Sequence, residues 1–477
     1  MLQLRSYQLT FIDAIRSSLV QHRRIIACAA TGSGKSKVFI SIAQSAVQRN
    51  RAVLVLTEST RIYTQLAAEL EPAHEINPDA ARWIHVQRGH IYVAMAQTLS
   101  RRKAMVAQFT SLGGSLLIIN DEAHIGTATS LIEAMPDALL IGFTATPDYR
   151  VAKHLPKLYQ NCVVGAQPQE LVEEGFLSPY RHFSREGADM KALQKVRGEF
   201  SEQSQRKAFD RPEVVAGILD DIRGADFKKA MIFCSSIAHA EHLHQQLPGS
   251  VVYHSLRADA ARQLAEFTHG SARICVSVGA LTKGFDYPAI DAIFLNRATT
   301  SLPLYLQMIG RGSRVTQGKD KFTVYDYGGN AGRFGLWNAD RDWASMWSGR
   351  NKRTLGIAPT RTCKNCGYIA PVSVTICPNC GAAFPVAASP ISDKATTLIN
   401  LTADYEPLRG RRISTLTPEE LTTYQRMTKR NAFCKRIAMS RGEEYLFQYA
   451  TLQGWKRGWN RFINAAPGAP FADITIR

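Results

Sequence analysis

A glycine-rich turn, AATGSGKS at residues 29–36, is the feature that most constrains what this chain can fold into. An apolar run at residues 25–28 precedes it, and a helix-compatible segment at residues 37–43 follows. Gly32 and Gly34 allow backbone N–H groups to curl around an anion, and a helix N-terminus adds partial positive charge. The pattern therefore predicts a strand, a phosphate-binding loop and a helix in that order.

The loop supplies side chains suited to a nucleotide as well as a backbone cradle. Lys35 is expected to reach the β- and γ-phosphates of ATP, and the Ser36 hydroxyl is expected to bind Mg²⁺. The general pattern begins with glycine where this chain has Ala29, and an ordinary strand-to-helix turn is the alternative. The residues predicted to bind the nucleotide here are Thr31, Gly32, Ser33, Gly34, Lys35 and Ser36.

Apolar runs at residues 52–57, 91–96, 115–120 and 139–143 alternate with helix-compatible segments. Such runs predict parallel strands buried on both faces, with ligand-contacting residues at their carboxyl ends. Asp121 and Glu122 follow the third run, where Asp121 could hold Mg²⁺ through water and Glu122 could deprotonate an attacking water. A surface acidic pair is the alternative. The other polar residues at or near strand ends are Thr57, Gln65, Gln97, Thr98, His124, Thr144 and Thr146.

Gln8, residues 29–36, residues 121–124 (DEAH) and residues 144–146 (TAT) together resemble the first motor domain of superfamily 2 helicases of the DEAH-box variety. A glutamine at position 8 could read the adenine edge through its amide, or simply cap a helix. The resemblance implies that His124, Thr144 and Thr146 couple nucleotide to nucleic acid. It also implies nucleic-acid contacts by Thr57, Gln65, Gln97 and Thr98.

A second set of apolar runs predicts a second parallel α/β domain, with strands at residues 230–234, 251–253, 273–278, 292–295 and 322–325. We expect the interdomain connection in the polar stretch 181–211. This half has no phosphate loop, but Arg311 and Arg314 are three residues apart and would share a helix face. Planar guanidinium groups suit a γ-phosphate bound to the other domain; a basic face exposed to solvent is the alternative.

These stretches resemble the fifth and sixth helicase motifs. The resemblance implies that Arg311 and Arg314 are arginine fingers and that Gln307 positions the attacking water. Gly284 and Asp286 would then couple the nucleotide site to nucleic acid, and Ser235 and Thr282 would contact the nucleic-acid backbone.

Four of the nine cysteines form two Cys-x-x-Cys pairs separated by ten residues. Such spacing is typical of a closed structural zinc site that supplies the folding energy of a small module. Redox thiols are the alternative. The predicted ligands of one Zn²⁺ are Cys363, Cys366, Cys377 and Cys380.

The net charge of +18 indicates a polyanionic partner, with nucleic acid favoured over an anionic membrane, although a merely solubilising surface is the alternative.

Helices are predicted at residues 418–441 and 443–453. The segment GWKRGWNRF at residues 454–462 interleaves aromatic and cationic residues, as single-strand binding requires; packing of the tail onto the motor is equally compatible. No run of about 18 apolar residues occurs, which argues against a membrane span. A secretory signal layout is lacking as well, and the scattered thiols suit the cytoplasm of a bacterial or phage-infected cell.

The sequence therefore predicts an α/β protein with two tandem RecA-like domains, a zinc ribbon and a helical tail. The expected boundaries are 1–180, 181–335, a linker at 336–358, the ribbon at 359–386 and the tail at 387–477. The whole order resembles the bacterial RadD-like DNA-repair helicases and their phage-encoded relatives, and implies an ATP-dependent DNA helicase or translocase. RNA as substrate, an ATP-gated clamp that does not unwind, and the motor subunit of a restriction system are the alternatives. A protein partner could bind the ribbon or the tail.

Overall fold

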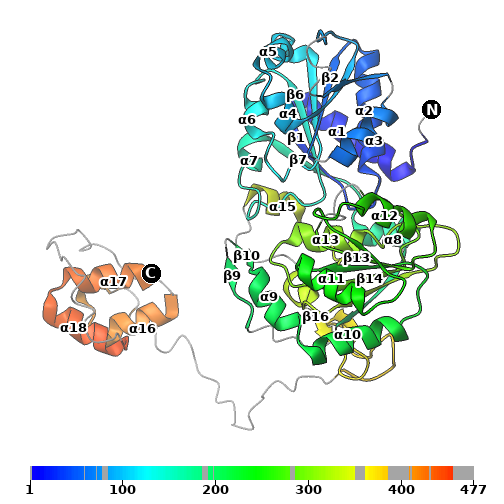
Figure 1. Cartoon of the computed structure of the whole chain (residues 1–477). Helices are drawn as coiled ribbons and strands as arrows, with labels where there is room; N and C mark the ends of the chain where they lie inside the picture. Colours follow the sequence, from blue (N-terminus) through cyan, green and yellow to red (C-terminus); the bar gives the residue numbers. More distant parts are fainter. Residues whose placement is uncertain are drawn as a thin grey trace. The chain divides into compact units, whose positions relative to one another are not determined.

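The computed structural model of the chain describes residues 3–58, 60–70, 72–77, 84–184, 192–196, 198–279, 285–349, 360–384, 408, 411–428 and 431–454. The chain divides into two compact units, Met1–Val386 and Ala387–Arg477, which are described separately below (Figure 1). Among the described residues, no helix combines the length and the apolar character needed to cross a membrane.

The first domain is a seven-stranded parallel sheet with strand order β3-β4-β2-β5-β6-β1-β7. Its side chains point alternately into two cores, one formed with α1–α3 and the other with α4–α7, so helices cover both faces (Figure 1). The predicted buried runs are thus strands. The strands are β1 (Arg24–Cys28), β2 (Ala52–Thr57), β3 (Ala73–Ile76), β4 (Ile91–Met95), β5 (Leu116–Asn120), β6 (Leu139–Thr144) and β7 (Asn161–Val164). The helices are α1 (Ser6–Gln21), α2 (Lys35–Gln48), α3 (Thr60–Glu69), α4 (Ala96–Ser100), α5 (Lys103–Ser111), α6 (Thr129–Glu133) and α7 (Leu155–Leu158).

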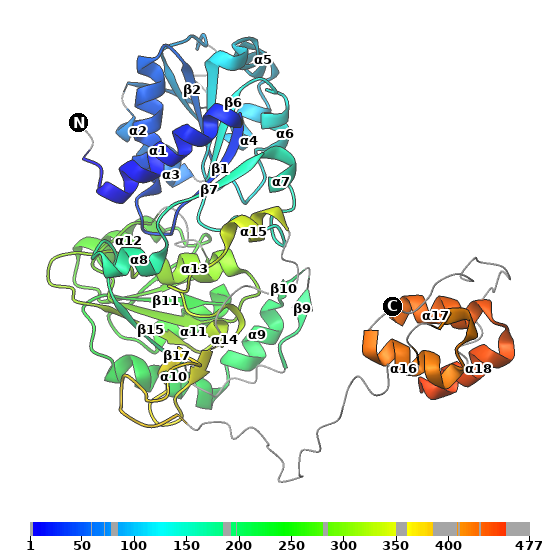
Figure 2. The ribbon, with the colours of Figure 1, turned by 180° about the vertical axis from the view of Figure 1, so that it is seen from behind.

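The second domain is a six-stranded parallel sheet with strand order β12-β13-β11-β14-β15-β8. One face packs on α9–α11 and the other on α8 and α12–α15 (Figure 2). Two parallel α/β domains therefore follow one another, as expected. The strands are β8 (Tyr180–Ser184), β11 (Ala230–Cys234), β12 (Val251–Tyr253), β13 (Ile274–Ser277), β14 (Ala292–Asn296) and β15 (Phe322–Asp326). The helices are α8 (Pro168–Glu173), α9 (Glu202–Phe209), α10 (Pro212–Gly224), α11 (Ile237–Gln245), α12 (Ala260–His269), α13 (Leu302–Gly310), α14 (Asn330–Phe334) and α15 (Trp343–Ser348). A small hairpin, β9 (Lys195–Val196) and β10 (Glu199–Phe200), adjoins this domain.

Two expectations about the connections are wrong. Residues 181–211 do not connect the domains, because β8 is already the edge strand of the second sheet and Leu171 and Leu177 belong to the second core. Residues 336–349 are not only a linker, since Trp337 is buried in that core and α15 packs against β7 and α7 of the first domain. The polar composition of the first stretch reflects an edge strand and exposed helix faces.

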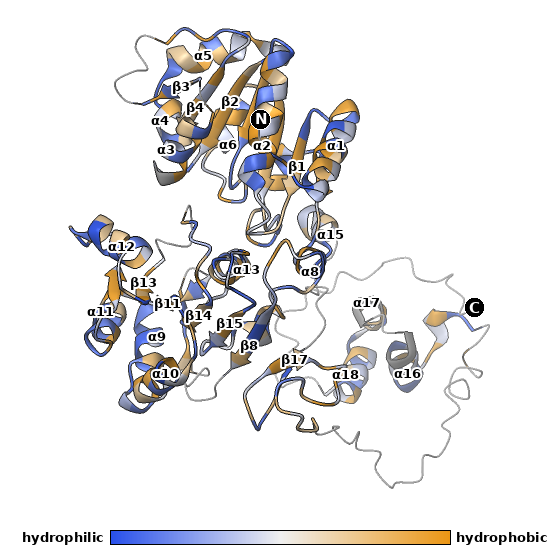
Figure 3. Cartoon of the chain, turned by 90° about the vertical axis from the view of Figure 1, so that its right-hand side faces the viewer, coloured by the Kyte–Doolittle hydropathy of each residue, from blue (hydrophilic) through white to orange (hydrophobic). Residues whose placement is uncertain are grey.

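The four cysteines follow the second domain on a hairpin formed by β16 (Thr360–Thr362) and β17 (Ile369–Pro371). The hairpin joins the free edge of the second sheet: Phe183 and Tyr368 form an antiparallel bridge, and Ser184 N donates to the carbonyl of Gly367 at 2.9 Å. β17 and β8 are neighbours in Figure 3.

The second unit is helical. Its described core lies between α16 (Pro418–Thr428), α17 (Asn431–Ser440) and α18 (Glu443–Leu452), with Leu421, Ile437 and Tyr449 buried. The predicted helix 418–441 corresponds to α16 and α17, and residues 429 and 430 between them lie outside the described residues. The aromatic and cationic segment beyond Gly454 lies outside the described residues.

Candidate nucleotide and nucleic-acid sites

The predicted phosphate loop lies at the carboxyl end of β1 and runs into α2. Gly32 and Gly34 have φ of +92° and +76°, a conformation that favours glycine. Gly34 caps α2, and the amides of Lys37 and Val38 donate to its carbonyl. Thr31 and Ser36 are half-buried. The loop therefore has the conformation that an anion cradle at a helix N-terminus requires.

Two side chains from α1 hold this loop. The Gln8 amide nitrogen donates to the carbonyl of Ser33 at 3.0 Å, while its oxygen accepts from the amide of Arg5. The Tyr7 hydroxyl donates to the same Ser33 carbonyl at 2.8 Å. Gln8 thus caps α1 and braces the loop, and its contact with adenine remains a proposal. Tyr7 was missed because one aromatic residue beside Gln8 has no distinguishing signal in the sequence.

The two acidic residues after β5 lie beside the loop. Lys35 Nζ is 3.3 Å from Glu122 Oε1, and His124 Nδ1 is 3.3 Å from Glu122 Oε2. Burial raises the pKa of Asp121 to about 7, with Glu122 adding to the rise and Lys35 opposing it. Burial also opposes ionisation of Glu122, but Lys35 and His124 outweigh it and hold the pKa of that carboxyl well below its usual range. Of the two carboxyl groups, Glu122 is therefore the one whose ionisation its neighbours favour.

Glu122 also has an unusual backbone conformation for its residue type, with φ of +49°. Left-handed backbone costs a non-glycine residue energy that the surroundings must supply, and such residues cluster at functional sites. His124 continues the contact chain, because its Nδ1 lies 3.0 Å from Thr144 Oγ1, which in turn accepts from the amide of Thr146. The carboxylate is thereby connected to the end of β6, and coupling through these residues stays a prediction.

The second domain reaches the loop through the residues that follow α13. Arg314 Nη1 donates to the carbonyl of Gly32 at 2.9 Å, and its Nε lies 3.2 Å from Asp286 Oδ1. Arg311 instead donates to the carbonyl of Phe285 within its own domain. Gln307 is buried in α13.

The expectation that Arg311 and Arg314 share a helix face is wrong. α13 ends at Gly310, and Arg314 forms an antiparallel bridge with Leu177. Gly312, in the turn after α13, has no room for a side chain, because a Cβ there would lie 2.5 Å from the Phe322 ring. Gly284 and Thr282 lie outside the described residues.

The predicted nucleic-acid contacts are at or near strand ends. Thr57 is buried at the end of β2, and Thr98 is half-buried in α4, after β4. Gln65 and Gln97 are exposed, although the Gln65 amide donates to Glu69 along α3. In the second domain, Ser235 follows β11 with its Oγ 3.3 Å from His239 Nδ1. Of these residues only Thr57 is fully buried.

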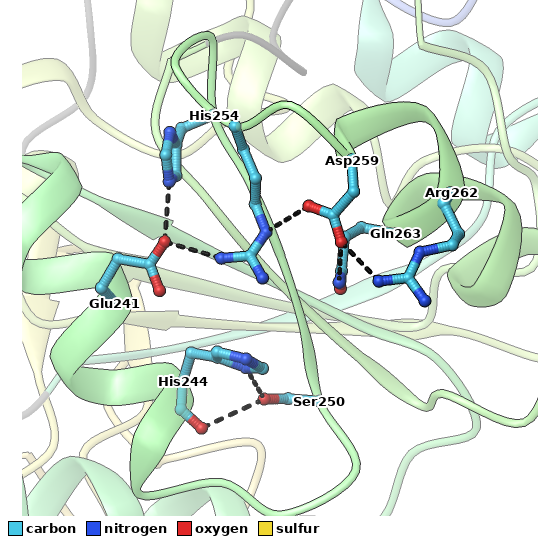
Figure 4. A network of polar contacts seen from close by, with 8 residues as sticks. Glu241, His244, Ser250, His254, Asp259, Arg262 and Gln263 are labelled. Atoms are coloured by element: carbon cyan, nitrogen blue, oxygen red, sulfur yellow. Dashed lines mark hydrogen bonds and ion pairs between the residues drawn. The ribbon is translucent and has the colours of Figure 1, made fainter.

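A polar network orders the neighbouring end of β12 (Figure 4). Glu241 accepts from His254 Nε2 and from Arg257 Nη1, each at 2.8 Å, and Arg257 Nε donates to Asp259 at 2.8 Å. The loop 254–259 is therefore fixed on two helices. Leu256 within it is 80% exposed. No sequence pattern indicates this network, because its members are dispersed over α11, the loop and α12.

The four cysteines converge as predicted. Their Sγ atoms all lie within 4.8 Å of one another, with Cys363–Cys380 at 3.7 Å and Cys366–Cys377 at 3.6 Å. Four thiolates about 2.3 Å from a central zinc ion are about 3.8 Å apart in a tetrahedron. Hydrogen bonds from Asn365 and from the backbone lower the pKa of the Cys380 thiol to about 6. The spacing fits zinc and far exceeds that of a disulfide.

Two family models match the motor region. The model described as "Type III restriction enzyme, res subunit" matches residues 1–149, and "Helicase conserved C-terminal domain" matches residues 211–316. The first match contains the phosphate loop and both carboxylates, and the second contains Arg311 and Arg314.

Similar proteins include a 51.5 kDa protein of a Lactococcus phage (isolate 7-9), 24% identical over 367 residues, covering 74% of this chain and 77% of that protein. IRC3 of Saccharomyces cerevisiae, named as a candidate ATP-dependent helicase, is 26% identical over 361 residues; the match covers 68% of this chain and 51% of IRC3. The type I restriction enzyme EcoKI endonuclease subunit of Escherichia coli is 25% identical over 412 residues, covering 68% of this chain and 34% of that subunit. This chain therefore spans only about half of IRC3 and one third of the restriction subunit.

Among solved structures, a fragment of a candidate HsdR subunit of a type I restriction enzyme from Vibrio vulnificus YJ016 has a similar fold. The TM-score is 0.56 at 22% identity, over 71% of this chain and 66% of that one.

Proposed function

We propose, on the premise that this chain carries the two motor domains of a superfamily 2 helicase, that it couples ATP hydrolysis to movement on DNA. One observation carries the proposal: groups from both domains meet at one phosphate loop. Lys35 lies against Glu122 within the first domain, and Arg314 of the second donates to the carbonyl of Gly32. A nucleotide at this loop would therefore contact both domains.

The residues of the loop would divide the work on ATP. Lys35 and the backbone amides would bind the phosphates, and Ser36 and Asp121 would hold Mg²⁺, which neutralises phosphate charge when bound. Glu122, kept ionised by its neighbours, would accept a proton from the attacking water, oriented with the help of Gln307. Arg311 and Arg314 would stabilise charge on the transferred phosphoryl group. Arg311 must first leave the Phe285 carbonyl.

Movement would follow from closing and opening of the two domains around ATP. His124, Thr144 and Thr146 would transmit the state of Glu122 to the strand ends. There Thr57, Gln65, Gln97, Thr98, Ser235 and Thr282 would contact the sugar-phosphate backbone, with Gly284 and Asp286 in support. The net charge of +18 supports a nucleic-acid partner. We assign the motor to the DEAH variety acting in DNA repair, recombination or replication, by the resemblance to RadD-like helicases.

The four cysteines would hold one structural zinc ion. Their sulfur–sulfur spacing supports this assignment. Metal analysis of purified chain should give about one zinc per molecule, and intact thiols without metal would contradict it.

The test of the motor is the steady-state ATPase rate, alone and with single-stranded DNA, forked duplex or RNA. Glu122→Gln serves as the blank, because an amide cannot accept the proton from water. We expect DNA to stimulate the wild-type rate, and the variant to bind ATP while losing nearly all turnover. Turnover equal to wild type in Glu122→Gln would refute the site assignment. Stimulation of the ATPase by RNA but not by DNA would exclude DNA as the substrate. Binding of DNA without strand displacement or translocation would favour the ATP-gated clamp.

A second candidate is the motor subunit of a restriction system. The match of residues 1–149 to the restriction-subunit model and the likeness to the EcoKI subunit favour it. No separate nuclease motif is evident in residues 390–477, and this candidate assigns cleavage to a nuclease-bearing partner chain. DNA cleavage that appears only when such a partner is added would support this candidate over a repair role.

A further inference from the structure

The turn that brings Arg314 to the phosphate loop is held by residues outside the helicase motifs. Ser178 lies just before β8 and is 1% exposed. Its backbone N–H donates to the carbonyl of Ser313 at 2.8 Å, and its hydroxyl donates to the carbonyl of Arg314 at 2.9 Å. Both hydrogen bonds of Ser178 therefore end on the arginine turn.

Lys319 holds the same turn from another direction. Its Nζ donates to the carbonyls of Gly312 at 2.6 Å and Arg314 at 2.8 Å, and reaches Pro288 at 3.2 Å. Burial lowers the pKa of Lys319 to about 8, with Asp291 opposing the shift and Arg314 adding to it. The side chain is thus mostly an ammonium group at neutral pH, with all three of its N–H groups placed to donate.

The two side chains converge on one atom, the carbonyl oxygen of Arg314, which accepts from the Ser178 hydroxyl and from Lys319 Nζ. Beyond this fixed main chain, the guanidinium reaches the Gly32 carbonyl and Asp286. A long side chain anchored at its own backbone has fewer positions available to its head group, and catalytic groups need supports of this kind to stay in place.

We infer that Ser178 and Lys319 are positioning residues for Arg314, setting where its guanidinium meets the phosphoryl group during ATP hydrolysis. This inference rests on the proposed function. Neither residue touches the loop itself; each acts through the main chain of the arginine turn. Since misplacement of a catalytic group by about 1 Å can cost about 100-fold in rate, loss of one anchor should appear in kcat.

The experiment compares Ser178→Ala with Ser184→Ala. Ser184 is the last residue of β8, the strand that Ser178 precedes, and its hydroxyl also donates to a main-chain carbonyl, that of Asp326, at 3.2 Å. Each variant therefore loses one hydroxyl-to-carbonyl hydrogen bond, worth roughly a 2- to 10-fold change in an equilibrium. We expect Ser178→Ala to lower kcat by about that factor with KM for ATP within about twofold, and Ser184→Ala to keep the wild-type kcat.

A double mutant separates positioning from general weakening of the fold. In an Arg314→Ala background the guanidinium is gone, so adding Ser178→Ala should change kcat no further. Lys319→Met should resemble Ser178→Ala, with a larger loss. Wild-type kcat in Ser178→Ala, or a loss undiminished in the Arg314→Ala background, would overturn the inference. Absence of ATPase activity in the wild-type chain would instead refute the proposed function.

Discussion

Gly310 of the second domain lies directly against Thr31 of the phosphate loop, and it gives the sharpest steric prediction. It ends α13 without left-handed backbone, so alanine is conformationally acceptable there. A Cβ at this position would nevertheless lie 2.4 Å from Thr31 Cγ2 and 2.8 Å from Thr31 Cβ. Carbon atoms prefer separations of about 3.5–4.0 Å, so one of the two elements must move by about 1 Å.

Overpacking of this kind costs about 1–3 kcal/mol, which is about 5- to 150-fold in an equilibrium. The cost applies only while the second domain contacts the loop, because Gly310 and Thr31 belong to different domains. We therefore expect Gly310→Ala to lower kcat/KM for ATP by a factor in that range, with little change in the melting temperature. Steady-state ATPase assays and thermal unfolding measure the two quantities.

Gly332→Ala is the matched control, since Gly332 also lies in a helix, α14, and a Cβ there meets nothing within 4 Å. A second variant tests the steric cause directly. Thr31→Ser removes the colliding Cγ2 and keeps the hydroxyl, so it should restore part of the activity in the Gly310→Ala background. Wild-type kcat/KM in Gly310→Ala, or a loss that Thr31→Ser leaves untouched, would refute the reasoning.

Two further predictions concern the second sheet. Gly367→Ala should lower the melting temperature more than Gly381→Ala. Both glycines have φ of +72°, but only at Gly367 would a Cβ meet a backbone atom, the Ser184 carbonyl oxygen at 2.7 Å. Equal decreases in melting temperature would show that the contact between the ribbon and β8 does not contribute to stability. In the wild type, burial lowers the pKa of His182 to about 3, so between about pH 3 and pH 6.5 the unfolded state binds more protons than the folded state. The free energy of unfolding therefore falls as the pH falls through this range, by up to about 1.4 kcal/mol per pH unit. His182→Phe should make this fall less steep. Asp326 lies 4.0 Å from His182, and burial raises its pKa to about 6, so it has the opposite effect on the free energy of unfolding in the wild type and in the variant. Urea titrations at pH 4–7 measure how this free energy depends on pH. The same pH dependence in both proteins would contradict the assignment to His182.

The sheets were predictable because their central strands are largely buried. Every residue of β2 and β11 is buried, and a continuous apolar run is what such strands require. β8 was missed for the opposite reason: as an edge strand of the sheet before the ribbon joins it, its sequence YRHFS reads as polar. The phosphate loop was predictable from local sequence alone, since its glycines, lysine and serine are consecutive.

The rest of the site depends on contacts between segments that are distant in the sequence, and the pattern of hydrophobic residues does not predict such contacts. Arg314 was identified by its residue type and by the motif residues beside it, but its position depends on the end of α13 at Gly310 and on the bridge with Leu177. Ser178 and Lys319 belong to no motif, and only the fold brings both to the Arg314 carbonyl. Residues 336–349 read as a linker because tryptophans among basic residues do not reveal that Trp337 is 1% exposed.

That last segment bears on how the two domains respond to a perturbation between them. The chain passes from the first sheet to the second after β7, and residues 336–349 return to the first domain, where the Tyr149 amide donates to the Met346 carbonyl. The two crossings are joined, since the Gln167 side chain bonds the backbone of Arg341, whose guanidinium is buried on four carbonyls. Two joined crossings restrict rotation more than a single hinge would. The second domain can therefore leave the phosphate loop only by a restricted rotation. The added methyl of Gly310→Ala opposes its return to the loop, which is why the cost should appear in turnover.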